Sequence, residues 1–214
     1  MAMTPLSRFV NHILPHASGI PRAMVIDELR NAIIRLCEDS LIWRVDIPAA
    51  DVSAGVDDYT IVPPTDTRML TFIAFQYDGN PLNHYTEEQL DELDYNWRSG
   101  KTGTPTAYTM YSPTRFKLNR LPEEDIVGGM DIRVAIKPTE TTQEVDEVFY
   151  DDYQQAAIAG ALSNLLAMPK KPWTNTLLAD EYAKLYNHEV QRARAKANKS
   201  YGRRGPTVRM RSWA

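Results

Sequence analysis

Apolar side chains recur at helical spacing in three stretches of the chain. In residues 22–39 they stand three and four positions apart, as on the buried face of an amphipathic helix. The same spacing predicts a helix over 146–167, which Pro169 ends, and a third helix over 176–199.

Local signals describe the flanks of these helices. Thr174 or Asn175 is a candidate N-cap for the helix over 176–199. The first 21 residues are interrupted too often for a long helix, which predicts an irregular arm. The interrupting residues are Pro5, Pro15, Gly19 and Pro21.

Short runs of β-branched and aromatic residues, separated by turn residues, fill the middle of the chain. They predict strands at 41–45, 59–62, 68–77, 106–111, 115–118 and 131–136. Asp78-Gly79 indicates a hairpin turn. Pro48 is expected to stop the first strand, and Gly128-Gly129 is expected to lie in a loop.

One short acidic helix is predicted inside this region, over 86–95. Thr86, with Gln89 three residues later, forms a capping-box pattern at its start. Its carboxylates indicate a solvated face and are Glu87, Glu88, Asp91, Glu92 and Asp94.

The element order predicts an α+β fold: a three-helix bundle, made of the N-terminal helix plus two C-terminal helices, with an inserted β-rich region and an extended C-terminal tail. The bundle takes 22–40 and 139–200, and the insertion takes 41–138. The arm covers 1–21 and the basic tail covers 201–214.

Small residues gather on one predicted helix. Ala157, Gly160 and Ala161 allow the backbone of another helix to approach closely. Glycine costs about 1 kcal/mol of helix propensity relative to alanine, so Gly160 indicates a packing requirement.

Charge is distributed very unevenly along the chain. The last 25 residues hold eight Lys and Arg and no Asp or Glu, while the rest is near −12 although the whole chain is −4. Such asymmetry predicts that the C-terminal end meets an acidic partner: nucleic acid, membrane or protein. Trp213 near the tip favours a socket on a folded protein over a purely ionic tether.

Few residues suggest chemistry. His12 and His16 are four positions apart, but Pro15 lies between them in the predicted arm, so solvated histidines are favoured over a metal site. Cys37 on an apolar helix face predicts a buried, inert thiol. No nucleotide-binding or nucleophile-elbow motif occurs, and no cofactor is expected. The single cysteine and the lack of a long apolar stretch predict a cytosolic setting without a membrane span.

Several segments together resemble the head–tail adaptor (head-completion, or connector) proteins of tailed bacteriophages over about residues 22–200. The segments are LRNAIIRLC at 29–37, LIW at 41–43, IKP at 136–138, YQQAAIAGAL at 153–162, MPKKPW at 168–173 and LADEY at 178–182. Their order and spacing, more than any single segment, carry the resemblance.

The resemblance implies a structural virion protein of the head–tail junction, assembled in the host cytoplasm, and not an enzyme. Such proteins have a helical bundle with a β-rich insertion. They form a ring, usually of twelve copies, on the portal. The ring extends the DNA channel, which DNA passes without sequence-specific binding, and offers a surface to a tail or nozzle protein.

Charge and resemblance together give a portal-binding hypothesis for the C-terminal end. Its proposed contacts are Arg192, Arg194, Lys196, Lys199, Tyr201, Arg203, Arg204, Arg209, Arg211 and Trp213. Two rival functions are weighed against it. A nucleic-acid-binding module would use the same basic end on phosphates, against which the acidic body argues. A carboxylate enzyme, such as a nuclease or hydrolase, would need acids that converge in a pocket.

Overall fold

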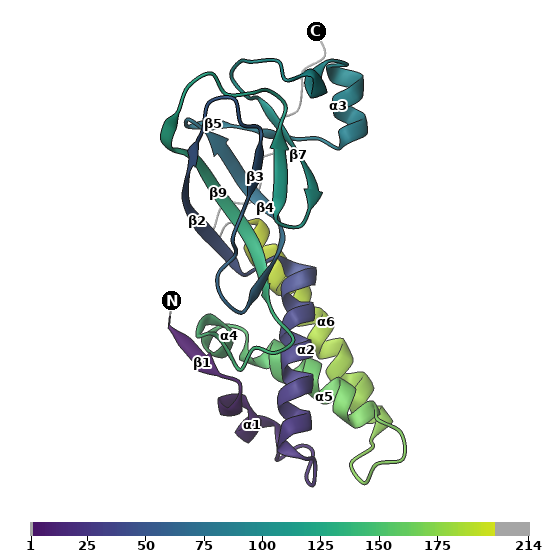
Figure 1. Cartoon of the computed structure of the whole chain (residues 1–214). Coiled ribbons are helices and arrows are strands. Elements are labelled where there is room, and N and C mark those ends of the chain that lie inside the picture. Colours follow the sequence, from purple (N-terminus) through teal and green to yellow (C-terminus); the bar gives the residue numbers. More distant parts are fainter. Residues whose placement is uncertain (1, 200–214) are drawn as a thin grey trace. The chain divides into compact units, whose positions relative to one another are not determined.

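The computed structural model describes residues 2–199, which divide into two compact units. One unit combines the described residues up to Ile42 with those from Pro138 onward, and the other runs from Trp43 to Lys137. Helices dominate the first unit and strands the second (Figure 1). The predicted α+β class is therefore confirmed at this coarse level.

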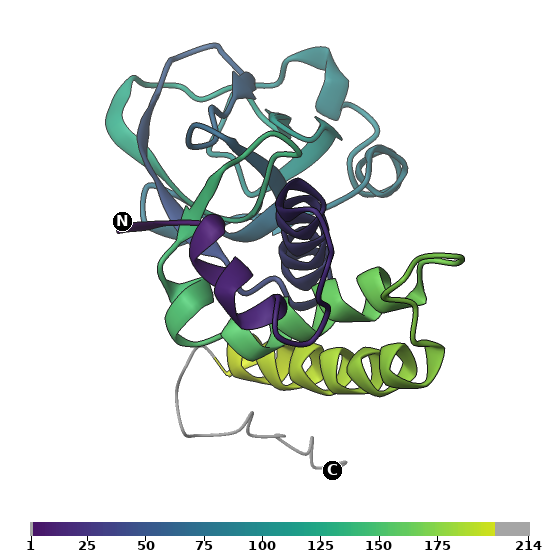
Figure 2. The same cartoon turned by 90° about the horizontal axis from the view of Figure 1, so that it is seen from below.

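Three long helices pack against one another in the helical unit. They are α2 (Arg22–Ser40), α5 (Gln154–Ala167) and α6 (Thr176–Asn198). The helices α5 and α6 lie side by side as a hairpin, and α2 contacts both (Figure 2). The side chain of Asn175 accepts the Leu178 N–H at 3.1 Å, so Asn175 is the predicted cap of α6. Thr174 instead donates its hydroxyl to the carbonyl of Met168 in the preceding loop.

The predicted helix over 146–167 is two helices, α4 (Val148–Asp151) and α5. No helix starts at residue 146, because β10 (Glu144–Asp146) pairs with β1 (Met3–Pro5) as an antiparallel ribbon. The carboxylate of Asp146 then accepts the Val148 N–H at 3.0 Å and begins a separate turn.

The prediction of an irregular arm over 1–21 is wrong. Beside β1, this segment forms the helix α1 (Ser7–Ile13), whose apolar side chains are buried in the helical unit. Pro5 ends β1, and Pro15 follows α1, so neither proline interrupts an element. Phe9 packs edge-on against Tyr150 with ring centroids 5.1 Å apart, which anchors α1 to the region of α4.

Two four-stranded sheets form the β-rich unit. The first has the order β2 (Arg44–Val52), β9 (Ile126–Pro138), β4 (Thr67–Tyr77) and β5 (Asn80–Pro81). The second has the order β3 (Asp58–Thr60), β8 (Arg115–Leu118), β7 (Ala107–Ser112) and β6 (Asn83–His84).

Aromatic rings form the core of this unit. The ring of Phe75 lies 4.9 Å from those of Tyr108 and Phe116, and Phe72 contacts all three. Because β4 supplies Phe72 and Phe75, while β7 and β8 supply Tyr108 and Phe116, this cluster joins the two sheets.

Two local predictions in this unit, a hairpin turn and a helix start, are confirmed. Asp78 and Gly79 form the two-residue connection between β4 and β5, with φ values of 45° and 72°. The helix α3 (Glu87–Leu93) begins with the capping box of Thr86 and Gln89. A short 3-10 helix, η1 (Trp97–Ser99), follows it.

Two other predictions in this unit are wrong. Pro48 does not stop a strand, since it lies inside β2 where the pairing with β9 shifts register; β2 is an edge strand, so the missing N–H is tolerated. Gly128 and Gly129 lie inside β9 and not in a loop. The φ of +65° at Gly128, opposite a second register shift of β2, explains why glycine stands there.

Candidate partner-binding surface

The C-terminal part of α6 carries the described members of the predicted portal-binding set. Small buried residues, Ala193 and Ala197, hold this part of the helix on its unit. Arg192, Arg194 and Lys196 are exposed on α6, and exposed Lys199 follows at its C-cap. The negative end of the helix dipole favours cations there. Tyr201, Arg203, Arg204, Arg209, Arg211 and Trp213 lie outside the described residues.

Two of these four cations have carboxylate partners within the same chain. Lys196 Nζ lies 2.8 Å from Asp152 Oδ2 and 5.3 Å from the centroid of the Tyr153 ring. Arg192 lies 3.6 Å from Glu189, one helical turn earlier. The contact of Lys196 joins the end of α6 to the junction of α4 and α5, so this lysine already has an internal partner.

Arg194 and Lys199 are the cations left for a partner. Neither forms an ion pair with a residue in 2–199, and both are exposed. An exposed guanidinium without an internal carboxylate loses little when it meets an external one, because no existing pair has to break. Among the described cations at the C-terminal end of α6, these two therefore have no carboxylate partner in residues 2–199.

The predicted helix-packing residues lie where the three long helices meet. Ala157 and Ala161 are fully buried, and a Cβ added at Gly160 would stand 2.8 Å from the Ala32 Cβ and from two ring carbons of Tyr186. The Tyr186 hydroxyl donates to the carbonyl oxygen of Ala32 at 3.1 Å. Glycine is thus required by the close approach of α2 and α6 to α5, which confirms the packing interpretation of Gly160.

Polar contacts add to this packing. Asn164 on α5 donates to the carboxylate of Glu28 on α2 at 2.7 Å. Buried Arg30 donates to the carbonyl of Thr142 at 2.7 Å and pairs with Asp27 at 2.8 Å. These bonds fix α2 to α5 and to the loop before β10.

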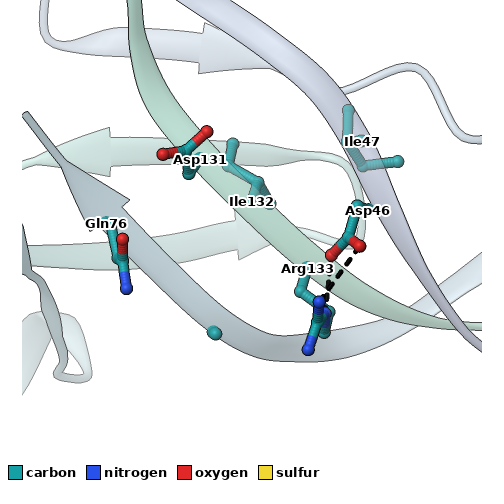
Figure 3. A pocket seen from close by; sticks show the side chains of 7 residues that line it. Asp46, Ile47, Gln76, Asp131, Ile132 and Arg133 are labelled. Atoms are coloured by element: carbon teal, nitrogen blue, oxygen red, sulfur yellow. Dashed lines mark hydrogen bonds and ion pairs between the residues drawn. The ribbon is translucent and has the colours of Figure 1, made fainter. Parts of the chain in front are cut away.

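A polar hollow of about 310 Å³ lies on the first sheet of the β-rich unit (Figure 3). Arg133 on β9 donates two hydrogen bonds, of 2.6 and 3.0 Å, to the carboxylate of Asp46 on β2. These bonds lower the pKa of Asp46. Asp131 points away from this pair, so the two carboxylates do not converge on one position. The arrangement is that of a cross-strand ion pair and not of a general acid and base.

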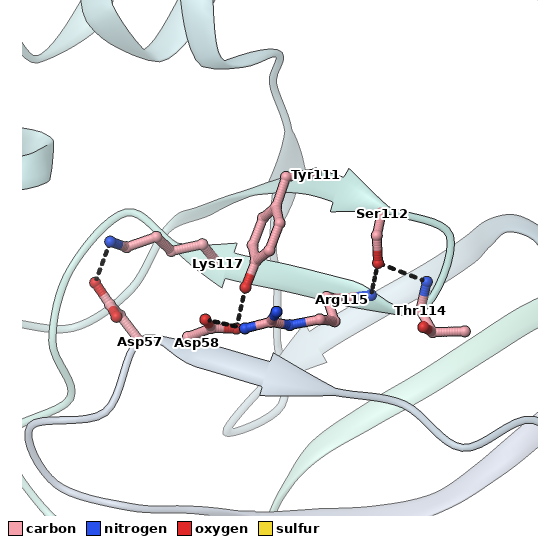
Figure 4. A network of polar contacts seen from close by, with 7 residues as sticks. All are labelled: Asp57, Asp58, Tyr111, Ser112, Thr114, Arg115 and Lys117. Atoms are coloured by element: carbon pink, nitrogen blue, oxygen red, sulfur yellow. Dashed lines mark hydrogen bonds and ion pairs between the residues drawn. The ribbon is translucent and has the colours of Figure 1, made fainter.

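A second polar network lies on the other sheet (Figure 4). Asp58 on β3 accepts a hydrogen bond from the Tyr111 hydroxyl and pairs with Arg115 at 2.7 Å. Lys117 pairs with Asp57 at 3.2 Å. Desolvation, together with the bond to Asp58, raises the pKa of Tyr111. Each carboxylate here is neutralised by a neighbouring cation, as in a stabilised sheet surface.

The residues considered for chemistry lie apart from one another. His12 hydrogen-bonds the Tyr150 hydroxyl at 3.2 Å, and His16 hydrogen-bonds the Tyr182 hydroxyl at 3.1 Å. Cys37 is buried, as predicted. In residues 2–199 no group of three His, Cys, Asp or Glu side chains is placed to hold a metal ion. None of the helices in that range has both the length and the apolar character that a membrane crossing requires.

Sequence reasoning missed one exposed apolar feature. Leu93 and Tyr95 are 64% and 89% exposed at the end of α3, beside the acidic face that the sequence predicts. It also missed a hollow of about 570 Å³ that includes Arg68, Met69 and Leu70 at the start of β4. The alternation of β4 predicts a strand but does not tell which of its side chains stay uncovered.

Comparison with known proteins gives no family. No family model matches the chain, and no curated protein matches it.

Proposed function

We propose that this protein is a head–tail adaptor: a structural, non-enzymatic subunit of a ring, twelve-membered as the resemblance implies, that docks on the portal of a tailed bacteriophage. In this proposal α2, α5 and α6 are the three-helix bundle, and the β-rich unit is its insertion. The ring extends the DNA channel and presents a surface to a tail or nozzle protein.

One observation carries the proposal. The packed helix α6 is followed in the sequence by a segment, 201–214, whose charged residues are all arginines. The contact of Tyr186 with Ala32, opposite Gly160, holds α6 in its unit. The exposed cations of α6 lead along the sequence to residues 201–214, which add four arginines and no acidic residue. Fourteen residues reach at most roughly 45 Å when extended, far enough to leave the parent subunit. An acidic groove of the portal is the partner that this charge fits.

Deleting residues 201–214 tests the proposal. The truncated protein should keep the helical and strand content of the parent, because the packing described above lies before residue 200. It should lose binding to purified portal, measured by electron microscopy of the mixture and by co-sedimentation. A full-length variant with Arg22→Glu serves as the control, since Arg22 lies at the opposite end of the sequence and forms no ion pair in the described range. Unchanged docking of the truncated protein would refute the proposal.

Binding of nucleic acid is the alternative, and Arg194 and Lys199, which have no ion pair within residues 2–199, favour it to the same degree. Phosphate contacts would give an affinity for duplex DNA that falls steeply with salt. A body near −12 opposes such binding. A salt titration of DNA binding by the isolated protein separates the two functions: a steep slope supports the alternative, and no binding at low salt eliminates it.

A further inference from the structure

We infer that two copies of this chain join head to tail through their β-rich units: an exposed apolar knob of one copy enters a cation-bearing hollow of the next. The knob is Leu93 with Tyr95, and the hollow is the cavity at the start of β4. The inference rests on the proposed function, because it names a contact between neighbours of the ring.

The knob is an apolar pair held outward by an ordered support. Leu93 and Tyr95 are 64% and 89% exposed, whereas Leu90 and Trp97 on either side are buried against Ala107. Trp97 Nε1 donates to Asp91 Oδ1 at 2.7 Å, and the capping box fixes the start of α3. Exposed large apolar side chains on a preorganised element are typical of interface anchors.

Acidic side chains lie on α3 together with Leu93 of the knob, and two of them have no ion-pair partner in residues 2–199. Arg98 pairs with Glu87 at 2.9 Å and with Asp91 at 3.2 Å. Glu88 and Glu92 form no ion pair with any residue in 2–199. The knob therefore fits a partner surface that is apolar at its centre and cationic at its rim.

The hollow has those two properties. Its apolar lining includes Pro63, Met69, Leu70 and Pro113, and its cations are Arg68 and Lys137. Met69 is buried and Leu70 half-buried, whereas Arg68 is exposed and has no ion pair in the described part of the chain. Its volume of about 570 Å³ lies within the range of about 300–1,000 Å³ that is usual for occupied clefts.

The two surfaces lie at opposite ends of one strand. The support of the knob packs on Ala107, the first residue of β7, and the hollow includes Pro113 and Thr114, which follow the last residue of β7. Six residues of strand span about 20 Å. The knob of a copy cannot reach its own hollow across this strand, but it can enter that of a second copy. Two different patches that meet in this way form a head-to-tail interface, the kind from which rings are built.

Thiol cross-linking gives the first test. A variant with both Tyr95→Cys and Leu70→Cys, treated with a short bis-maleimide, should form a ladder of covalent multimers. The two single variants, mixed, should stop at dimers, and each alone should remain monomeric. The native Cys37 is buried and gives little background. Absence of the ladder, or dimers from Tyr95→Cys alone, would overturn the inference.

Charge reversal gives the second test, read by sedimentation velocity of the full chain at low salt. Arg68→Glu should weaken self-association at least tenfold, and adding Glu92→Arg should restore part of it. Arg22→Glu removes an exposed cation of the helical unit, outside the two proposed patches, and should change nothing. Equal effects of Arg68→Glu and Arg22→Glu, or a parent protein that stays monomeric at its highest soluble concentration, would overturn the inference. All these variants keep residues 201–214, so failure of this contact and failure of portal docking are separate results.

Discussion

The hydroxyl of Tyr186 on α6 donates to the carbonyl oxygen of Ala32 on α2 at 3.1 Å, across a gap that only glycine at position 160 leaves open. The two residues are 154 positions apart in the chain. This contact therefore joins α2 to α6 directly over Gly160 of α5. It is the most specific packing relationship in the helical unit, and it can be tested residue by residue.

Gly160→Ala should destabilise the protein even though alanine favours a helix. The added Cβ would stand 2.8 Å from the Ala32 Cβ and from the Tyr186 ring, so the helices must move apart. Overpacking of this kind costs about 1–3 kcal/mol, which offsets or exceeds the roughly 1 kcal/mol gained in helix propensity. Urea unfolding measures the difference. In the Gly160→Ala background, Ala32→Gly should cost less than it does alone, whereas strict additivity would contradict the contact.

Tyr186→Phe isolates the hydrogen bond from the ring. The ring should stay in place, and loss of the bond to the Ala32 carbonyl should lower the free energy of unfolding by about 1 kcal/mol. Tyr182→Phe is the matched control, since its hydroxyl bonds His16 in a less buried position and should matter less. Equal effects of the two substitutions on chemical unfolding would show that the Tyr186 hydroxyl has no special role.

Alkaline pH should weaken the β-rich unit through Tyr108. Burial raises the pKa of Tyr108 to about 12, above the ordinary value of 10.0. A raised folded-state pKa means that the stabilisation is fully present below about pH 10 and is lost as the pH rises toward 12. Unfolding followed from pH 8 upward should show this decline, and Tyr108→Phe should flatten it. A decline of the same size in the variant would assign it to other groups.

The sequence predicts the packing role of Gly160 but not its partners. A glycine in a helix is unfavourable, so its presence indicates a close approach, which is local information. That Ala32 and Tyr186 make the approach depends on how distant helices meet, and no local signal carries it. The same limit applies to the knob. Leu90 and Leu93 are both apolar positions of one acidic helix, yet only tertiary packing on Ala107 makes one buried and the other exposed.

The prediction for the N-terminal segment, an irregular arm over 1–21, is wrong for a different reason. Leu6, Phe9, Val10 and Ile13 do stand at helical spacing, but the helix α1 has only seven residues, with Leu6 as its N-cap. Isolated helices of that length are unstable in water, so the pattern is weak evidence beside several prolines. Tertiary contacts, such as that of Phe9 with Tyr150, supply the stabilisation.

The internal partner of Lys196 predicts a ranking of the cations on α6 in portal binding. Lys196 already pairs with Asp152, whereas Arg194 has no ion pair in the described range. Arg194→Gln should therefore weaken portal binding more than Lys196→Gln, by a factor of several, as surface pairs contribute up to about 1 kcal/mol each. Asp152→Asn should release Lys196 and strengthen binding slightly. Biosensor titrations against immobilised portal, at two salt concentrations, measure these changes. If Lys196→Gln is the more harmful substitution, then Lys196 exchanges Asp152 for the portal, and the ranking drawn from its internal pair is wrong.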